Sequence, residues 1–141
     1  MLSVICPIYN EEKYIAGCID SIIAQNYPKD DIEVIFADGM SSDQTRKIVA
    51  QYAERYNWIR LVDNPRKIVP PALNAAVKAS RGDVIIRIDA HASYPSNYFS
   101  ALATALKRYD ADNVGAVCRT DVLVKTPKSL AIREVLAHPL G

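Results

Sequence analysis

Cysteine is scarce in this sequence, with only Cys6, Cys18 and Cys118 among 141 residues. Their number is odd, and none lies in a Cys-x-x-Cys or Cys/His spacing, so the pattern predicts neither a disulfide framework nor a zinc site. Cys6 and Cys118 fall in apolar runs and Cys18 falls in a helical pattern, which is typical of buried thiols. Buried, reduced thiols suit a cytoplasmic protein.

Long apolar runs and an excess of one charge are also lacking. No run approaches the roughly 18 apolar residues that span a bilayer, and Met1 leads into a β-branched run without a basic leader. The net charge of +1 gives no broad attraction to nucleic acid or to anionic lipid. Half of the residues are hydrophobic, which is enough for one compact domain. We expect a cytoplasmic segment. Any association with the inner face of the plasma membrane would depend on residues beyond Gly141.

Apolar, β-branched runs alternate along the chain with segments of helical period. The predicted strands cover residues 3–8, 33–37, 58–62, 83–88 and 113–118. The predicted helices cover residues 11–26, 43–57 and 72–80, a segment from a Ser96 cap to Tyr109, and residues 128–138 behind a Thr126 cap. Ser41 or Ser42 is expected to cap the second helix.

This alternation predicts one α/β domain over residues 1–141, with a mostly parallel sheet between two layers of helices. The chain reaches Gly141 without a closing element, so we expect the domain to continue beyond it. Ligands of such sheets bind outside the carboxyl ends of the strands. That rule selects three segments, residues 7–11, 38–43 and 89–91.

Asp38 is the main candidate in the second of these segments. It ends a strand, and Gly39 after it permits a tight turn. A carboxylate at this point can accept a hydrogen bond from the N–H of a nucleobase or from a ribose hydroxyl. Ser42 and Asp43 are better explained as caps of the following helix.

Aromatic and polar residues follow the first strand. Tyr9 can stack its ring on a base or fill the core. Asn10 and Glu11 can meet a ligand or cap the next helix, whose first turn favours acids. The sequence alone leaves both alternatives open.

Asp89 and His91 follow the fourth strand with one residue between them. In an extended chain this spacing places both side chains on the same side. A divalent cation held there would bridge two phosphates and neutralise charge on a leaving diphosphate. A carboxylate suits Mg²⁺ or Mn²⁺, and an imidazole shifts the preference toward Mn²⁺. A purely structural histidine is the alternative.

Two further candidates lie between the second and third segments. Lys67 follows the third strand in a basic turn, where it can reach a phosphate or stay solvated. Asn74, on the next helix, can face the same crevice or lie on the helix surface.

Three motifs, in this order, resemble those of the family-2 glycosyltransferases. Residues 4–12 (VICPIYNEE) resemble their opening strand, and residues 38–45 (DGMSSDQT) resemble the turn after their second strand, with Met40 where a glycine is usual. Residues 73–76 through 81–83 resemble the helix before their metal motif. The resemblance implies the GT-A fold, a Rossmann-like three-layer α/β/α arrangement of which residues 1–141 form the N-terminal, nucleotide-sugar-binding part.

Further segments resemble a bacterial subgroup that includes a succinoglycan-type exopolysaccharide glucosyltransferase. These segments are residues 69–76, 87–95, 113–115 and 126–127. The resemblance implies inverting transfer of a sugar from a UDP-sugar to a hydroxyl of a glycan or polyprenyl-linked acceptor, in the synthesis of cell-surface polysaccharide. An inverting enzyme needs a general base, which in the family lies further along the chain than residue 141. We therefore expect this segment to bind donor and to transfer little.

The resemblance also implies roles for single residues. Pro7 and Tyr9 would lie against the uracil, and Asp38 would accept its N–H. Asp89 would lie beside the ribose and the metal, Mg²⁺ or Mn²⁺. His91 occupies the second position of the family's Asp-x-Asp metal motif, where it keeps a ligand atom but changes its type. The remaining expected donor-site residues are Glu11, Lys67 and Asn74.

Three other interpretations compete with this one. A nucleotidyltransferase that makes sugar nucleotides has a similar sheet, but it opens with a glycine-rich phosphate loop that residues 7–12 lack. A phospho-acceptor signalling module needs paired acids after the first strand, and Asn10 interrupts that pair. A non-catalytic interaction protein of the same fold stays open, because His91 replaces an aspartate.

Overall fold

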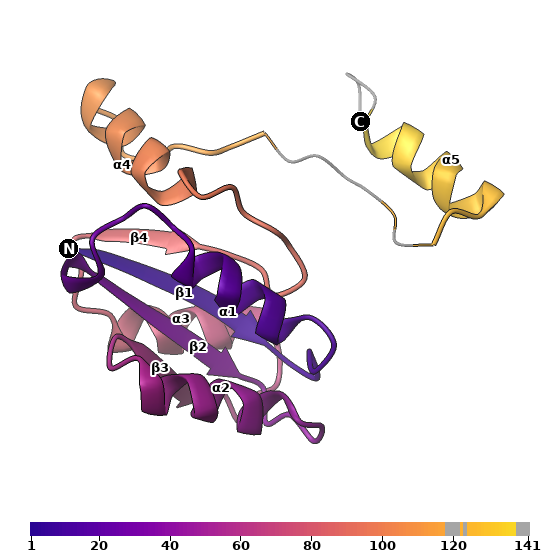
Figure 1. Ribbon diagram of the computed structural model, residues 1–141, viewed down its shortest axis with the longest axis horizontal. Coiled ribbons are helices and arrows are strands. Elements are labelled where there is room, and N and C mark those ends of the chain that lie inside the picture. The colour runs from indigo at the N-terminus through magenta and orange to yellow at the C-terminus, as the bar shows by residue number, and fades with distance from the viewer. Residues whose placement is uncertain (118–121, 123, 138–141) are drawn as a thin grey trace.

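The computed structural model describes residues 1–117, 122 and 124–137 (Figure 1). The strands are β1 (Leu2–Ile8), β2 (Ile32–Asp38), β3 (Ile59–Asp63) and β4 (Val84–Arg87). The helices are α1 (Ile15–Ile23), α2 (Thr45–Arg55), α3 (Val69–Ala79), α4 (Tyr98–Arg108) and α5 (Pro127–Leu136), with a short 3-10 turn at Lys29–Asp31. Each of these strands is followed by a helix, as the alternation in the sequence predicts.

The four strands form one parallel sheet in the order β3-β2-β1-β4, which confirms the predicted α/β class. The central strands β1 and β2 are buried along nearly their whole length, as expected for strands covered on both faces. In the register, Ile8 lies beside Asp38, and Asp38 lies beside Asp63. The carboxyl ends of β1, β2 and β3 are therefore level at one edge.

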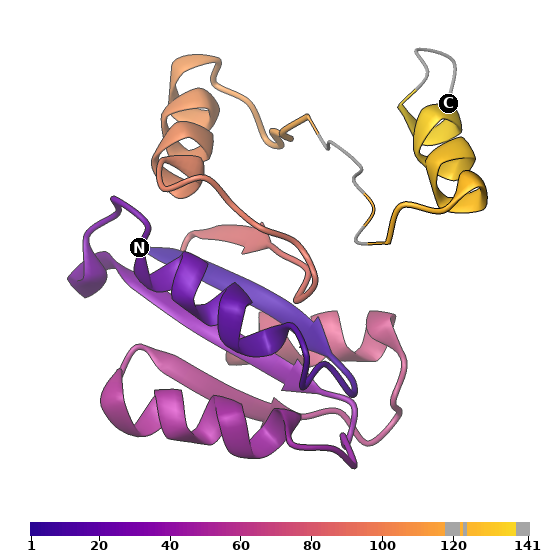
Figure 2. The same cartoon turned by 45° about the vertical axis from the view of Figure 1, so that its right-hand side comes forward.

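Helices cover both faces of the sheet, with α1 and α2 on one side and α3 on the other (Figures 1 and 2). Residues of β1 alternate between the two cores because successive side chains of a strand point to opposite faces. Val4 and Cys6 join the core that α1 covers, whereas Ile5 packs with Ala72 and Ala76 of α3. The two alanines contribute only small side chains to that second core.

The predicted starts of α1 and α4 are each displaced. α1 begins at Ile15 rather than at residue 11, and residues 12–14 form a turn ahead of it. The N–H groups of Glu11 and Glu12 bond to the side chains of Thr45 and Asp43. α4 begins at Tyr98. Its N-cap is Asn97 and not Ser96, and the Asn97 side chain makes no cap bond.

The predicted caps have mixed outcomes. α2 begins at Thr45 behind Gln44, which makes no side-chain cap bond, so neither Ser41 nor Ser42 caps this helix. The cap predicted for α5 is confirmed, because Thr126 accepts a hydrogen bond from the N–H of residue 129 and forms a capping box with it.

The predicted fifth strand is wrong over residues 113–117, which have no regular structure. A strand needs a hydrogen-bonded neighbour, and among the described residues none pairs with this segment. Val117 is 89% exposed, so the apolar residues that suggested a strand are not buried here. Cys118, the last residue of that prediction, lies outside the described residues.

A buried acid holds together the edge of the sheet formed by the amino ends of the strands. Glu33 accepts hydrogen bonds from the Ser3 hydroxyl at 2.7 Å and from the Arg60 guanidinium at 2.7 Å. It also accepts the backbone N–H of Arg81 at 2.5 Å and the Arg81 Nε–H at 3.1 Å. We call Glu33, Ser3, Arg60 and Arg81 the Glu33 cluster. It links β1, β2 and β3 to the connection between α3 and β4.

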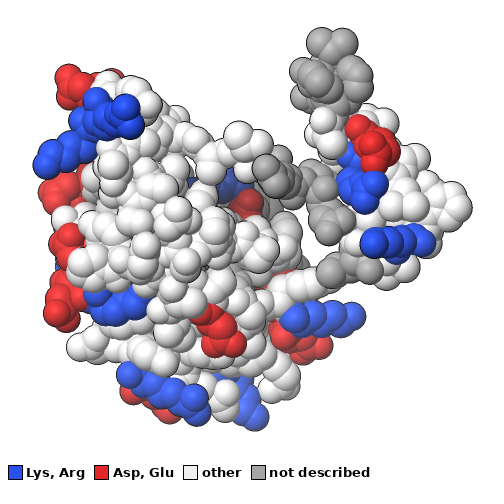
Figure 3. All heavy atoms as spheres, turned by 45° about the horizontal axis from the view of Figure 1, so that its top comes forward, with Lys and Arg blue, Asp and Glu red and all other residues white. Residues whose placement is uncertain are grey.

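Beyond the sheet, α5 lies apart from the other helices in both views (Figures 1 and 2). Three of its apolar side chains, Ile132, Val135 and Leu136, are exposed. Across the described ranges no helix combines the length and the apolar character needed to span a membrane. On the face in Figure 3, acidic and basic side chains lie interspersed, in keeping with the net charge of +1.

Candidate functional site

Two loops at the carboxyl ends of β1 and β2 are hydrogen-bonded to each other. The Asn10 N–H donates to Ser41 Oγ at 2.9 Å, and the Ser42 N–H donates to Asn10 Oδ1 at 2.9 Å. The Glu11 N–H donates to Thr45 Oγ1 at 2.7 Å. Polar side chains of each loop therefore bond to backbone N–H groups of the other loop. These N–H groups would be costly to bury without a partner. The two loops form one edge rather than two separate turns.

Two residues of this edge adopt the left-handed backbone region. Asn10 has φ of 54° and Met40 has φ of 61°. Asparagine tolerates this region, but for methionine it costs about 1 kcal/mol. The conformation explains in physical terms why a glycine is usual at the position of Met40, since glycine has no Cβ to clash.

Asp38 ends β2 with a fully buried side chain, 0% exposed. Its Oδ2 accepts the Ser41 N–H at 3.0 Å and Arg46 Nη1–H at 2.6 Å, and its Oδ1 accepts the Ser41 hydroxyl at 2.5 Å. A second nitrogen of Arg46 donates to Asp63 Oδ1 at 2.9 Å. The bond to Asp38 and, to a smaller extent, the bond to Asp63 raise the pKa of Arg46. The predicted ligand carboxylate is thus held by three protein donors.

Tyr9 lies beside Asp38 at the surface of the same edge. Its side chain is 48% exposed, so it is not core filler. A Cβ on Gly39 would stand 3.1 Å from Tyr9 Cδ2 and 3.3 Å from Tyr9 Cβ, so the ring lies directly against Gly39 and would have to shift slightly to admit a larger residue there. Pro7, two residues earlier, is partly buried and pairs with Ala37 in the register.

Asp89, Ala90 and His91 form a turn after β4 and not the extended segment that the sequence suggested. The Ala92 N–H donates back to the Asp89 carbonyl at 3.2 Å. Ala90 is buried, while the Asp89 and His91 side chains are 46% and 64% exposed. The two candidate metal ligands therefore both reach solvent, while the side chain between them is buried.

Glu11 connects the β4 turn to the loop edge. Its Oε1 lies 3.5 Å from His91 Nδ1, and its side chain is 21% exposed. On the other side of the turn, Arg87 Nη2 lies 3.3 Å from Asp89 Oδ1. The structure thus brings the predicted residues Glu11, Asp89 and His91 to one side of the site.

Tyr94 holds this turn through the backbone of Asp89. Its hydroxyl accepts the Asp89 N–H at 2.8 Å and donates to the Asp89 carbonyl at 3.3 Å. Burial raises the pKa of Tyr94, so the phenol stays protonated and can make both bonds. Beside it, Cys18 Sγ lies 3.9 Å from the same carbonyl, and Cys6 and Cys18 are both buried with free thiols.

The donor set fits a divalent cation that a ligand helps to bind. Within the described part of the chain, no group of three or more His, Cys, Asp or Glu side chains is arranged to hold a metal alone. Asp89 and His91 offer one carboxylate and one imidazole at an open turn, and both atom types coordinate Mn²⁺. Mg²⁺ and Mn²⁺ sites in phosphate-binding proteins take their remaining ligands from phosphate and water.

The other two predicted residues have different positions. Lys67 has φ of 61° in an exposed turn. Its N–H bonds to the Asn64 carbonyl at 3.0 Å, while the Asn64 N–H bonds to the Asp38 carbonyl at 2.8 Å, so this turn adjoins the site. Asn74 is exposed on α3, on the side of the helix opposite Ala72 and Ala76, and is not brought to the loop edge.

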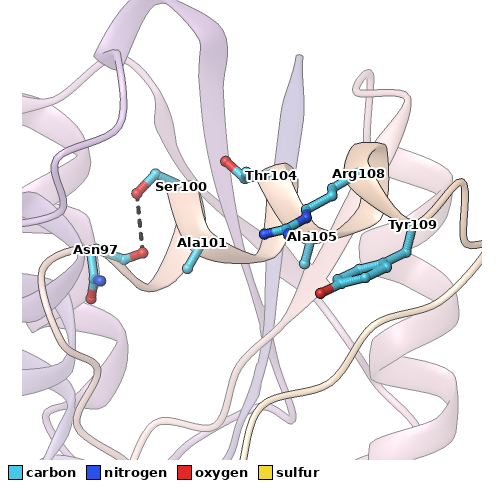
Figure 4. Close-up of a pocket in the computed structure, with 7 residues that line it drawn as sticks. All are labelled: Asn97, Ser100, Ala101, Thr104, Ala105, Arg108 and Tyr109. Carbon is cyan, nitrogen blue, oxygen red and sulfur yellow. Dashed lines mark hydrogen bonds between the residues drawn. The ribbon is translucent and has the colours of Figure 1, made fainter.

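A pocket of about 340 Å³ lies elsewhere, along α4 (Figure 4). The side chains in Figure 4 all come from this helix and its two ends, from Asn97 through Ser100 and Thr104 to Arg108 and Tyr109. None of the predicted site residues lines it. The pocket is therefore separate from the edge where the candidate residues gather.

Sequence reasoning missed the residues that support the site. Arg46 bonds to Asp38 and Tyr94 bonds to the backbone of Asp89, while Asp63 holds Arg46, but nothing in their spacing indicates which group they reach. Gly39 is the exception, since a glycine directly after a strand-end aspartate indicates a crowded turn.

Solved structures of similar fold define the class of this protein. The mannosyltransferase PcManGT from Pyrobaculum calidifontis, in complex with GDP-Man and Mn²⁺, superposes with a TM-score of 0.70 at 33% identity, over 94% of this chain and 37% of its own. S. aureus TarS 1-349, in complex with UDP-GlcNAc, superposes with a TM-score of 0.70 at 25% identity, over 84% of this chain and 37% of its own. The fold is that of the GT-A glycosyltransferases.

The family follows from the sequence match. The model of glycosyl transferase family 2 matches residues 3–139, so the chain belongs to that family. Among curated relatives, the succinoglycan biosynthesis protein ExoA of Rhizobium meliloti is 33% identical over 119 residues, covering 83% of this chain and 36% of the relative. The chain spans 14% to 41% of the length of eight curated relatives that it matches.

Proposed function

We propose that this chain forms the nucleotide-sugar-binding part of an inverting glycosyltransferase of cell-surface polysaccharide synthesis. The donor would be a UDP-sugar, and the acceptor a hydroxyl of a glycan or polyprenyl-linked chain. One observation carries the proposal: exposed Tyr9, buried Asp38 and the Asp89–His91 turn lie at the same edge of a parallel sheet. Ligands of such sheets bind at that edge. The names of similar proteins, in succinoglycan biosynthesis and in complex with UDP-GlcNAc, support the same function.

The base of the donor stacks on Tyr9 and bonds to Asp38. An exposed aromatic ring is a stacking platform for a base. Oδ2 of Asp38 already accepts two donors, whereas Oδ1 accepts one, the Ser41 hydroxyl. A carboxylate oxygen has two lone-pair sites, so Oδ1 can take one N–H once the Ser41 hydroxyl turns aside. Uracil presents a single N–H between two carbonyls, which suits one acceptor atom.

The diphosphate lies toward the β4 turn, with a divalent cation on Asp89 and His91. Bound there, Mg²⁺ or Mn²⁺ acts as a Lewis acid for the leaving diphosphate. The complex of PcManGT with GDP-Man and Mn²⁺ supports this choice of metal. Glu11, 3.5 Å from His91 Nδ1, orients the imidazole. Lys67 lies in the turn after β3, next to Asp38 and on the far side of the sheet from β4, so its contact with a phosphate stays a prediction.

Inversion requires a general base that deprotonates the acceptor hydroxyl as it attacks the anomeric carbon. We assign this role to none of the residues described above. We propose that the base belongs to a longer protein of which this chain is a part, and that residues 1–141 alone bind donor without appreciable transfer. A polyprenyl-linked acceptor would place the whole protein at the inner face of the plasma membrane.

Calorimetric titration with UDP, with and without Mn²⁺, tests the proposal directly. We expect Mn²⁺-dependent binding that is lost in Asp38→Ala and in His91→Ala, and retained in Asp30→Ala, an exposed aspartate outside the site. Asp38→Asn serves as a second variant, because it keeps the shape of the buried side chain. Melting curves on each variant establish that it is folded.

The outcomes separate the parts of the proposal. The absence of UDP binding by the unsubstituted chain, with and without Mn²⁺, would contradict the donor site. Binding that survives His91→Ala but not Asp38→Asn would keep the nucleotide site and remove the metal role of His91.

A further inference from the structure

We propose that Arg46 is a positioning residue that selects which oxygen of Asp38 is offered to the base of the donor, and that Asp63 holds Arg46 in place for this task. The inference rests on the proposed function and adds two residues to its donor site. Neither residue touches the base. They act through the carboxylate of Asp38.

Arg46 makes two bonds with two different nitrogens. Nη1 lies 2.6 Å from Asp38 Oδ2, and Nη2 lies 2.9 Å from Asp63 Oδ1. A guanidinium is planar and rigid, so fixing one nitrogen on Asp63 fixes the direction of the other. A lysine, with a single charged atom on a flexible stem, cannot reproduce both contacts at once.

The two partners of Arg46 differ in exposure. Asp38 is 0% exposed and Asp63 is 61% exposed, while Arg46 itself is 36% exposed. The bond to Asp38 therefore lies in a medium of low dielectric constant, where a charged hydrogen bond is strong. The bond to Asp63 lies near solvent and contributes orientation more than stability.

The consequence concerns the acceptor sites of Asp38. Arg46 and the Ser41 N–H together use both sites of Oδ2. The acceptor site that remains is on the buried Oδ1, which the base reaches once the Ser41 hydroxyl turns aside. If Arg46 is shortened, the carboxylate can rotate and offer either oxygen, so a base is held less specifically.

This positioning predicts discrimination between UDP and CDP. Uracil carries an N–H at position 3, whereas cytosine carries a lone pair there, which repels a carboxylate oxygen. A hydrogen bond to a charged group strengthens binding by about 10- to 100-fold over a ligand that lacks it. We expect the unsubstituted chain to bind UDP more tightly than CDP by about 10-fold or more.

The test compares the ratio of the CDP and UDP dissociation constants among Arg46→Lys, Asp63→Asn and a matched control. Arg55→Lys is the control, because Arg55 is an exposed arginine in the last turn of the same helix. We expect the ratio to fall by about 3- to 10-fold in Arg46→Lys, by about 2- to 3-fold in Asp63→Asn, and not at all in Arg55→Lys. Asp63→Asn changes an exposed side chain, so its ratio of dissociation constants can be measured even if Arg46→Lys destabilises the fold.

The measured ratio distinguishes positioning from a merely structural role. Equal weakening of UDP and CDP in Arg46→Lys, with an unchanged ratio in Asp63→Asn, would overturn the inference and leave the proposed function intact. An unsubstituted chain that binds neither nucleotide would instead overturn the proposed function, and the inference with it.

Discussion

β2 carries a buried acid near each of its ends, and the two acids have opposite surroundings. Glu33 is the second residue of the strand and Asp38 is the last. Their side chains are 1% and 0% exposed, and each is paired with arginine and bonded to a serine hydroxyl. Burial and pairing alone therefore do not distinguish a structural acid from a functional one.

What differs is the part of the chain that encloses each acid. The partners of Glu33 come from β1, β3 and the connection between α3 and β4, and its oxygens receive four bonds. The partners of Asp38 come from a loop and from α2, beside an exposed Tyr9 and a left-handed Met40. The comparison teaches that the strained and exposed neighbours, not the acid itself, distinguish the edge that we propose as the ligand site.

The largest expected effect is that of Glu33→Ala. Removing one partner of a buried ionic cluster costs about 3–5 kcal/mol of unfolding free energy, because the remaining charges lose their counter-ion. Urea denaturation measures the loss, and Glu54→Ala, an exposed acid of α2, should change it by less than about 0.5 kcal/mol. The UDP affinity of the folded variant should be unchanged.

That second measurement can break the comparison. If folded Glu33→Ala binds UDP many-fold more weakly, the two ends of β2 are coupled and the Glu33 cluster is not purely structural.

Acid should weaken the fold through the same cluster. Burial alone would raise the pKa of the Glu33 carboxyl, but the hydrogen bonds from Ser3, Arg81 and Arg60 outweigh it and lower the pKa from 4.5 to about 2. A lowered pKa stabilises the fold above pH 4.5, and that contribution, about 3 kcal/mol, is lost as the pH falls toward 2.

Urea midpoints measured between pH 7 and pH 2 report this loss. Glu33→Gln, which cannot titrate at this position, should lose about 3 kcal/mol less than the unsubstituted protein over the same range. Parallel curves for the two proteins would show that other carboxylates cause the acid sensitivity.

Periodicity predicted the fold well because the sheet is built from local patterns. The runs at β1 and β2 are continuous and apolar, which indicates strands covered on both faces. The same rule failed at residues 113–117, where a short apolar run has no neighbouring strand among the described residues. The turn ahead of α1 was not predictable from local pattern, since the side chains bonded to the N–H groups of Glu11 and Glu12 lie about 30 residues away in the sequence.

The candidate site was predictable only in its outline. Strand ends indicated Tyr9, Asp38 and Asp89, because the fold rule needs only the order of elements. The bonds that orient them were not predictable, since Arg46 and Tyr94 act through contacts that depend on rotamer and register. Asn74 has a suitable residue type and is exposed on the side of α3 opposite Ala72 and Ala76, so its role in the site stays a prediction.

The smallest effects come from placing one methyl group at each edge. At the amino edge, a Cβ on Gly82 would lie 2.6 Å from the Met1 carbonyl oxygen and 2.7 Å from Ser3 Oγ. Backbone must move to admit it, so Gly82→Ala should cost about 1–3 kcal/mol of unfolding free energy. UDP affinity should not change, because the clash is at the far end of the strands.

At the ligand edge the same substitution should have the opposite signature. A Cβ on Gly39 meets Tyr9 at 3.1 Å, and that half-exposed ring can shift outward at a cost below about 1 kcal/mol. A displaced ring stacks less well, so UDP affinity in Gly39→Ala should fall by about 3- to 10-fold, part of the usual contribution of base stacking. Calorimetry and urea denaturation on both variants test the contrast. Loss of affinity in Gly82→Ala, or unchanged affinity in Gly39→Ala, would show that the division between a structural edge and a ligand edge is wrong.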